Sequence, residues 1–233
     1  MKIFWLLVAG LAMAGCGDDG GGGGDADSDV DTDADTDADT DADTDTDEPM
    51  RSVLFINEIH VGLNGPDDTN GDATSPAAAA EIANKGTEDV TLGDVSLCTR
   101  PTYLPVGAKV TIPAGGFLMV FWEPGTNTDT EVFGAQRDEG DADFLIGLEV
   151  AGGELALYNS RVDFYSGATM IDFVRWGTGP AQTREIEAIS VGLWTEGETA
   201  DVAGWDDANC LARTTDDHTA AAWAVGACTA GSE

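Results

Sequence analysis

One stretch of the sequence carries oxygen-bearing side chains at alternating positions. Asp68, Asn70 and Asp72 are each separated by a single residue, and Gly71 allows the chain to bend between them. Carboxylate and amide oxygens are the ligands that Ca²⁺ prefers. A complete loop of this kind also needs a bidentate acid at its twelfth position, which is Ala79 when counted from Asp68. Two interpretations therefore stay open, a Ca²⁺ site and an Asx- and Gly-rich turn between two strands.

The sequence contains two histidines, His60 and His218, and neither belongs to a recognisable motif with a serine or cysteine nucleophile. No Gly-x-Ser-x-Gly segment and no Walker-type phosphate loop occurs. The chain has 44 acidic residues, so a pair of carboxylates is more simply a solvated acidic face than a general acid and base. We therefore expect no catalytic residues.

The N-terminus is typical of an export signal. Lys2 precedes the apolar run 3–14, which is shorter than the roughly 20 residues that span a bilayer. Small residues and then a cysteine follow, and the segment 13–16 (Met-Ala-Gly-Cys) resembles the lipobox of bacterial lipoproteins. The resemblance implies cleavage after residue 15 and acylation of Cys16. Because Gly17 rather than an acidic residue comes next, it favours the outer membrane over the inner one.

Three further cysteines follow Cys16, and an export route would permit disulfides between them. Cys210 and Cys228 close a short loop within a polar C-terminal segment, so we prefer this pair, with a gain of about 3 kcal/mol from the crosslink. Cys98 ends an apolar run and is predicted to be a buried thiol. No Cys-x-x-Cys spacing or Cys/His cluster indicates zinc.

Residues 16–50 are predicted to be a disordered acidic linker. Aspartate occupies every odd position from Asp25 to Asp47, and the segment carries 15 acidic residues without a base. Such a composition cannot bury enough apolar surface to offset the entropy of ordering, and its like charges favour extended shapes. We interpret the segment as a stalk rather than a store for Ca²⁺, because flexible carboxylates form no preformed cage.

The remaining residues, 51–233, carry 29 acidic and 9 basic side chains, a formal net charge of −20. A surface of this sign repels the phosphates of nucleic acids and anionic lipid headgroups. Basic proteins, cations and neutral glycans remain as partners. Four tryptophans could form a sugar-binding platform, although such residues more often belong to the core: Trp122, Trp176, Trp194 and Trp205.

Short apolar runs separated by Gly, Asn, Asp and Ser predict an all-β sandwich or barrel for residues 51–233. Residues 117–122 and 170–176 are the clearest of these runs. Two segments favour helix by intrinsic propensity, Pro76–Asn84 and Thr183–Trp194. A C-terminal extension begins at about residue 180 and lacks strong strand signals.

Six segments between Val53 and Gly177 resemble, in order, the lamin tail domain family. Ile-Asn-Glu-Ile at 56–59 is similar to its first strand, and Ile-Pro-Ala-Gly-Gly-Phe at 112–117 is similar to its turn into a central strand. The other four segments are 81–86, 90–97, 152–159 and 171–177. The resemblance implies an immunoglobulin-like β-sandwich, and it implies that Ala78 to Asn84 is a strand rather than a helix.

The sequence therefore predicts a lipid-anchored β-sandwich of the cell envelope that binds or scaffolds and does not catalyse. Its expected partners are membrane lipid, through acyl chains on Cys16, and an unidentified envelope protein or glycan, with no nucleic acid. Two alternatives remain open, an accessory or weak hydrolase that uses carboxylates or Ca²⁺ and a purely structural spacer.

Overall fold

A computed structural model describes residues 48–61, 78–99, 102–106, 109–123, 125–134, 136–138, 143–144, 148, 150–163, 166–178, 183–206, 208–229 and 231. Cys16, the signal segment, the acidic linker up to residue 47 and the loop with Asp68, Asn70 and Asp72 lie outside these residues. Among the described residues, no helix combines the length and the apolar character needed to cross a bilayer.

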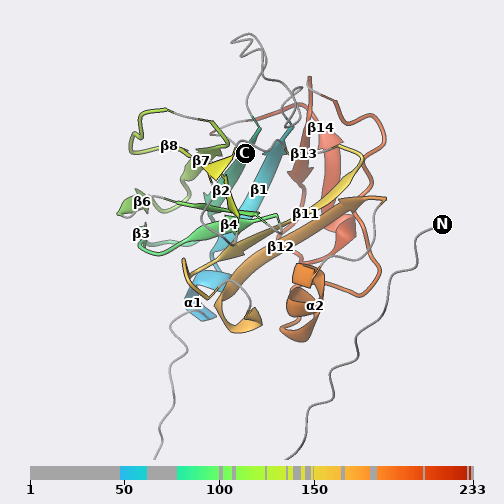
Figure 1. Cartoon of the computed structure of the whole chain (residues 1–233), viewed down its shortest axis with the longest axis horizontal. Coiled ribbons are helices and arrows are strands. Elements are labelled where there is room, and N and C mark those ends of the chain that lie inside the picture. The colour runs from blue at the N-terminus through green and yellow to red at the C-terminus, as the bar shows by residue number, and fades with distance from the viewer. Residues whose placement is uncertain are drawn as a thin grey trace, which may run out of the picture. The chain divides into compact units, whose positions relative to one another are not determined.

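The folded part is an all-β sandwich, which confirms the predicted fold class (Figure 1). Sheet A has the strand order β14-β13-β1-β2-β7-β8, and sheet C has the order β10-β9-β5-β4-β11-β12. Among these described strands only β7 and β8 pair in parallel. The bounds in sheet A are β1 Leu54–His60, β2 Ala79–Asn84, β7 Phe117–Phe121, β8 Glu131–Phe133, β13 Cys210–Arg213 and β14 Trp223–Gly226.

Sheet C consists of β4 Ser96–Cys98, β5 Thr102–Pro105, β9 Gln136–Asp138, β10 Asp143–Phe144, β11 Gly152–Tyr158 and β12 Met170–Gly177. A small sheet B pairs β3 Val90–Leu92 with β6 Val110–Ile112. The helical elements are α1 Glu48–Arg51, α2 Thr183–Ser190 and two 3₁₀ turns, η1 Gly167–Thr169 and η2 Ala220–Ala222. Both α1 and α2 lie at the same end of the sandwich (Figure 1).

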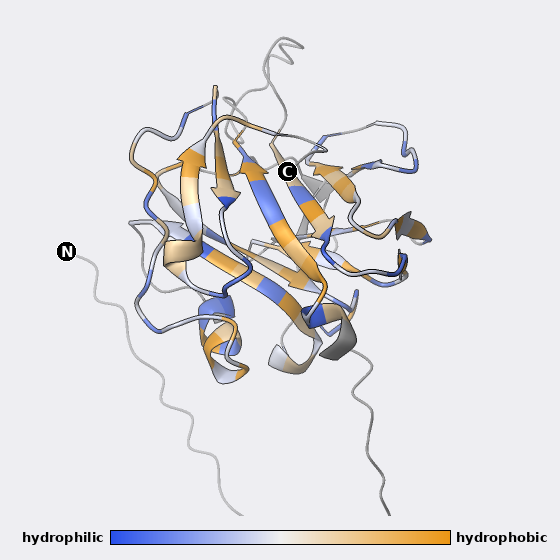
Figure 2. Ribbon diagram, turned by 180° about the vertical axis from the view of Figure 1, so that it is seen from behind, coloured by the Kyte–Doolittle hydropathy of each residue, from blue (hydrophilic) through white to orange (hydrophobic). Residues whose placement is uncertain are grey.

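The core lies between sheets A and C and follows the two-residue period of strands. In β7, Leu118 and Val120 are fully buried, whereas Phe117, Met119 and Phe121 are only half-buried on the outer face. Hydrophilic bands interrupt otherwise hydrophobic strands in Figure 2. The apolar residues that fill the space between the sheets include Leu54, Ile56, Ile82, Leu97, Leu104, Leu155, Leu157 and Val174.

The helix predicted by propensity for Pro76–Asn84 is wrong where the structure describes it. Residues 79–84 form β2, a central strand that pairs with both β1 and β7. Both faces of this strand are buried, and this burial overrides the helix propensity of the alanines. The strand implied by the family resemblance is therefore the correct alternative, and α2, within Thr183–Trp194, is the helix that forms.

The segment after about residue 180, in which the sequence shows no strong strand signals, forms part of the sandwich. It provides α2, and β13 and β14 complete one side of sheet A beside β1. At the other boundary the fold begins earlier than Arg51, because α1 starts at Glu48. The Arg51 Nε donates to the Met170 carbonyl at 2.7 Å and fixes α1 against the start of β12.

A buried polar layer separates α2 from sheet C. The Tyr158 hydroxyl donates to Glu187 at 2.6 Å, and Arg184 Nη1 pairs with the same carboxylate at 3.1 Å. Arg175 of β12 binds Glu185 at 2.6 Å. These pairs satisfy charges that the helix would otherwise bury alone.

Candidate functional site

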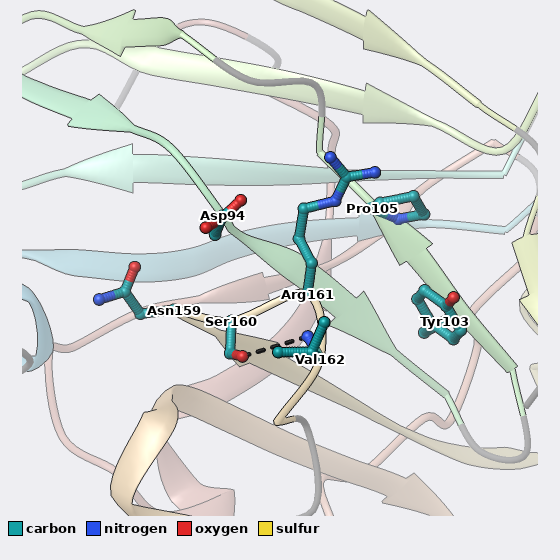
Figure 3. A pocket seen from close by; sticks show the side chains of 7 residues that line it. All are labelled: Asp94, Tyr103, Pro105, Asn159, Ser160, Arg161 and Val162. Carbon is teal, nitrogen blue, oxygen red and sulfur yellow. Dashed lines mark hydrogen bonds between the residues drawn. The ribbon is translucent and has the colours of Figure 1, made fainter.

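A hollow of about 440 Å³ lies beside strand β5 and the turn that follows β11 (Figure 3). Figure 3 shows the Arg161 side chain running past Pro105, with Asp94 on one side of it and Tyr103 on the other. The turn is fixed by Ser160, whose Oγ accepts from the backbone N–H of Asp163 at 2.7 Å. Seven residues line the hollow: Asp94, Tyr103, Pro105, Asn159, Ser160, Arg161 and Val162.

The lining of this hollow combines an aromatic ring with hydrogen-bonding groups of different kinds. Tyr103 offers a ring and a hydroxyl, Asn159 an amide, Asp94 a carboxylate and Arg161 a guanidinium. Arg161 is exposed and has no ion-pair partner among the described residues. An aromatic ring together with several hydrogen-bond donors and acceptors suits a small polar ligand that carries many hydroxyls.

The second notable site is a pair of carboxylates on the outer face of sheet A. Glu58 of β1 and Glu81 of β2 stand directly opposite each other in the strand register, and their exposed fractions are 1 % and 0 %. The C-terminal tail crosses above them. The Thr229 N–H donates to Glu58 at 2.9 Å, and the Gly231 N–H donates to Glu81.

The environments of the two carboxylates push their pKa values apart. Burial raises the pKa of Glu58, but hydrogen bonds from His60 and Thr229 outweigh it and leave that pKa below its usual value. For Glu81, burial prevails over the bonds from Gly231 and Asn57, so its pKa is raised. Two acids with opposite shifts are a pattern seen in acid–base catalysis. Here both are occupied by the tail, and neither carboxylate lines a described hollow.

An apolar groove of about 630 Å³ continues from this pair along β7. Its floor is the half-buried row Phe117, Met119 and Phe121, and the ring of Phe133 stacks on Phe121 with centroids 4.8 Å apart. The groove is lined by His60, Gly115, Gly116, Phe117, Met119, Phe121, Thr130, Glu131 and Gly231.

The two histidines have structural surroundings. His60 Nε2 lies 3.3 Å from Glu58, and His218 Nδ1 lies 3.1 Å from Asp172. Asp172 also binds Arg213 at 2.5 Å and accepts the Ile56 N–H at 2.8 Å, which ties β12 of sheet C to β1 of sheet A. Burial alone would raise the pKa of Asp172, but Arg213 and His218 have the larger opposite effect. The pKa therefore lies below its usual value, and the carboxylate is ionised.

The structure joins Cys210 and Cys228 by a disulfide, the pair preferred from the sequence. Their sulfur atoms lie within 4.8 Å of a nitrogen of His60, a grouping of metal-ligand types that the sequence spacing did not indicate. The disulfide occupies both sulfur atoms, so they are not thiolate ligands for a metal ion. Cys98 is a buried thiol and accepts a hydrogen bond from Arg184 Nε at 3.2 Å.

The suggested tryptophan platform is wrong, because its four members are core residues with exposed fractions of 2–5 %. The calcium candidates Asp68, Asn70 and Asp72 and the lipidation candidate Cys16 are outside the described residues. Sequence reasoning missed the Tyr103 hollow and the acid pair, since both depend on strand register and turn position. For the acid pair, the only signal in the sequence was the Asn-Glu dipeptide within an apolar first strand.

No family model and no curated protein matches this chain. The resemblance to lamin tail domains therefore stays a prediction.

Proposed function

We propose that the protein is a membrane-anchored, non-enzymatic binding module of the cell envelope, and that its ligand is a saccharide held in the Tyr103 hollow. The N-terminal sequence, with its apolar run and lipobox-like cysteine, supports the anchor at Cys16 and an address in the outer membrane. The acidic linker then serves as a stalk that holds the sandwich away from the lipid.

The observation that supports saccharide binding is the composition of the hollow. Tyr103 supplies a ring for the apolar face of a sugar, while Asn159, Asp94 and Arg161 supply donors and acceptors for hydroxyls. A neutral glycan is also one of the ligand classes that a domain with a net charge of −20 does not repel. Five of the seven lining residues lie on connections between strands, where binding residues are commonly found, and the other two, Tyr103 and Pro105, belong to β5.

A glycan array probed with the purified full chain in detergent tests this proposal. Tyr103→Ala should lose binding to the saccharides that the wild type retains. Arg161→Ala should weaken it by about tenfold without disturbing the core, because the Arg161 side chain is exposed. The matched control is Ile186→Ala, an exposed residue of α2 outside the hollow. Absence of saccharide binding, or equal binding by Arg161→Ala, would reject the proposal and leave the spacer alternative.

The hydrolase alternative has one observation in its favour, the paired carboxylates Glu58 and Glu81 with pKa values shifted in opposite directions. Their oxygens are bound by Thr229, Gly231 and Asn57, so a substrate would have to displace the tail first. Glycoside turnover by the wild type that disappears in Glu81→Gln would support this alternative.

A further inference from the structure

We propose that the apolar groove over β7 is a docking site for an extended segment of a partner protein in which an apolar side chain is flanked by basic residues. The groove is separate from the Tyr103 hollow, so this inference stands or falls independently of saccharide binding.

The apolar half of the proposal rests on the row of side chains that β7 turns outward. Phe117, Met119 and Phe121 are half-buried although they point away from the sandwich core, and they line a groove of about 630 Å³. Phe133, stacked on Phe121, extends the aromatic surface toward β8. Contiguous aromatic and methionine side chains on a surface are typical of protein interaction sites.

The C-terminal tail shows that backbone N–H groups can be bound on this face of sheet A. The tail starts at Cys228, which is fixed to β13 by the disulfide, and crosses β1 and then β2. Two alternate residues, Thr229 and Gly231, direct their N–H groups to Glu58 and Glu81. Gly231 then forms one wall of the groove, so a partner segment would lie next to a chain already bound in this manner.

Charge identifies the partner segment more closely. Glu131 lines the groove and has no ion-pair partner among the described residues. At the opposite end, Lys85 Nζ lies 6.0 Å from the centre of the Phe117 ring, so an ammonium group already sits against this aromatic surface. A basic residue on the ligand is attracted by Glu131 and repelled by Lys85, while the domain charge of −20 favours basic over acidic flanks overall.

Fluorescence anisotropy of labelled nonapeptides against the purified full chain tests the inference. The probes carry a central phenylalanine or alanine, flanked by two lysines or by two glutamates. The lysine-flanked phenylalanine peptide should bind, and Phe121→Ala should weaken it by about tenfold. Glu131→Lys, a substitution at a partly exposed position, should reverse the preference from lysine to glutamate flanks.

Ile186→Ala is the control for both variants and should bind as the wild type does. The inference is overturned if no peptide binds at millimolar concentration, or if binding ignores the flanking charge. It is equally overturned if Phe121→Ala, shown by circular dichroism to be folded, binds normally. Retention of the protein by neutral lipid vesicles with no peptide binding would assign the groove to membrane contact instead.

Discussion

Replacing Glu154 by glutamine should stabilise the folded protein above pH 7 and leave its stability nearly unchanged below pH 4. The Glu154 side chain in β11 is only 2 % exposed, and burial raises its pKa from 4.5 to about 7. The backbone N–H groups of Arg184 and Glu185, at the start of α2, favour the charged form but do not outweigh burial. Neither carboxylate oxygen has a well-formed hydrogen bond within the described residues.

The size of the effect follows from the two protonation equilibria. Below pH 4.5 the carboxyl is neutral in both the folded and the unfolded chain, and its burial costs little. As the pH rises from 4.5 to about 7, the unfolded chain ionises first, so stability is lost until the folded group also ionises. This pKa difference corresponds to about 3 kcal/mol, which the neutral glutamine avoids.

Urea unfolding followed by tryptophan fluorescence at pH 4 and pH 8 measures this difference. Glu154→Gln should increase the free energy of unfolding by up to about 3 kcal/mol at pH 8 and by less than about 0.5 kcal/mol at pH 4. Glu196→Gln, which removes an exposed carboxylate, should change neither value by more than about 0.5 kcal/mol. Equal shifts at both pH values, or a loss of stability at pH 8, would refute the reasoning.

Three other predictions follow from the same contacts. Arg213→Met leaves Asp172 buried without its cation and should lower the free energy of unfolding by about 3–5 kcal/mol. The double variant with Asp172→Asn should recover part of this loss. A loss below about 1 kcal/mol in urea unfolding would contradict the role given to the ion pair between the two sheets. Reduction of the Cys210–Cys228 disulfide, whose cysteines are 18 residues apart, should cost about 3 kcal/mol, and an unchanged melting temperature would speak against it. If the loop 67–72 binds Ca²⁺, millimolar Ca²⁺ should raise the melting temperature of the full chain, and a flat response would end that hypothesis.

Parts of the fold could be predicted because local pattern and tertiary context agree there. The apolar runs at 117–121 and 170–177 are strands, since alternation or full burial is visible in the residues themselves. The segment 79–84 was ambiguous because alanine favours helix, and its place between β1 and β7 decided the outcome. β13 and β14 gave no clear signal, because a four-residue strand is too short to show a period and is stabilised by its partners: β13 pairs with β1, and β14 pairs with β13.

The candidate sites were less predictable than the strands. Glu58 and Glu81 are 23 positions apart, and only the β1–β2 register, with its bulge after Ile56, brings them opposite each other. The Tyr103 hollow likewise joins β5 to the turn after β11, two segments whose contact no spacing rule encodes. The disulfide was within reach of sequence reasoning because a short loop between two cysteines restricts the choices.

The proposed place in the envelope depends most on the lipid anchor, and mass spectrometry of the N-terminal peptide from the native protein tests that anchor directly. The mature chain should begin at Cys16 and carry fatty acyl groups on that residue. A native protein that retains residues 1–15, or one whose first residue lacks fatty acid, would contradict this prediction.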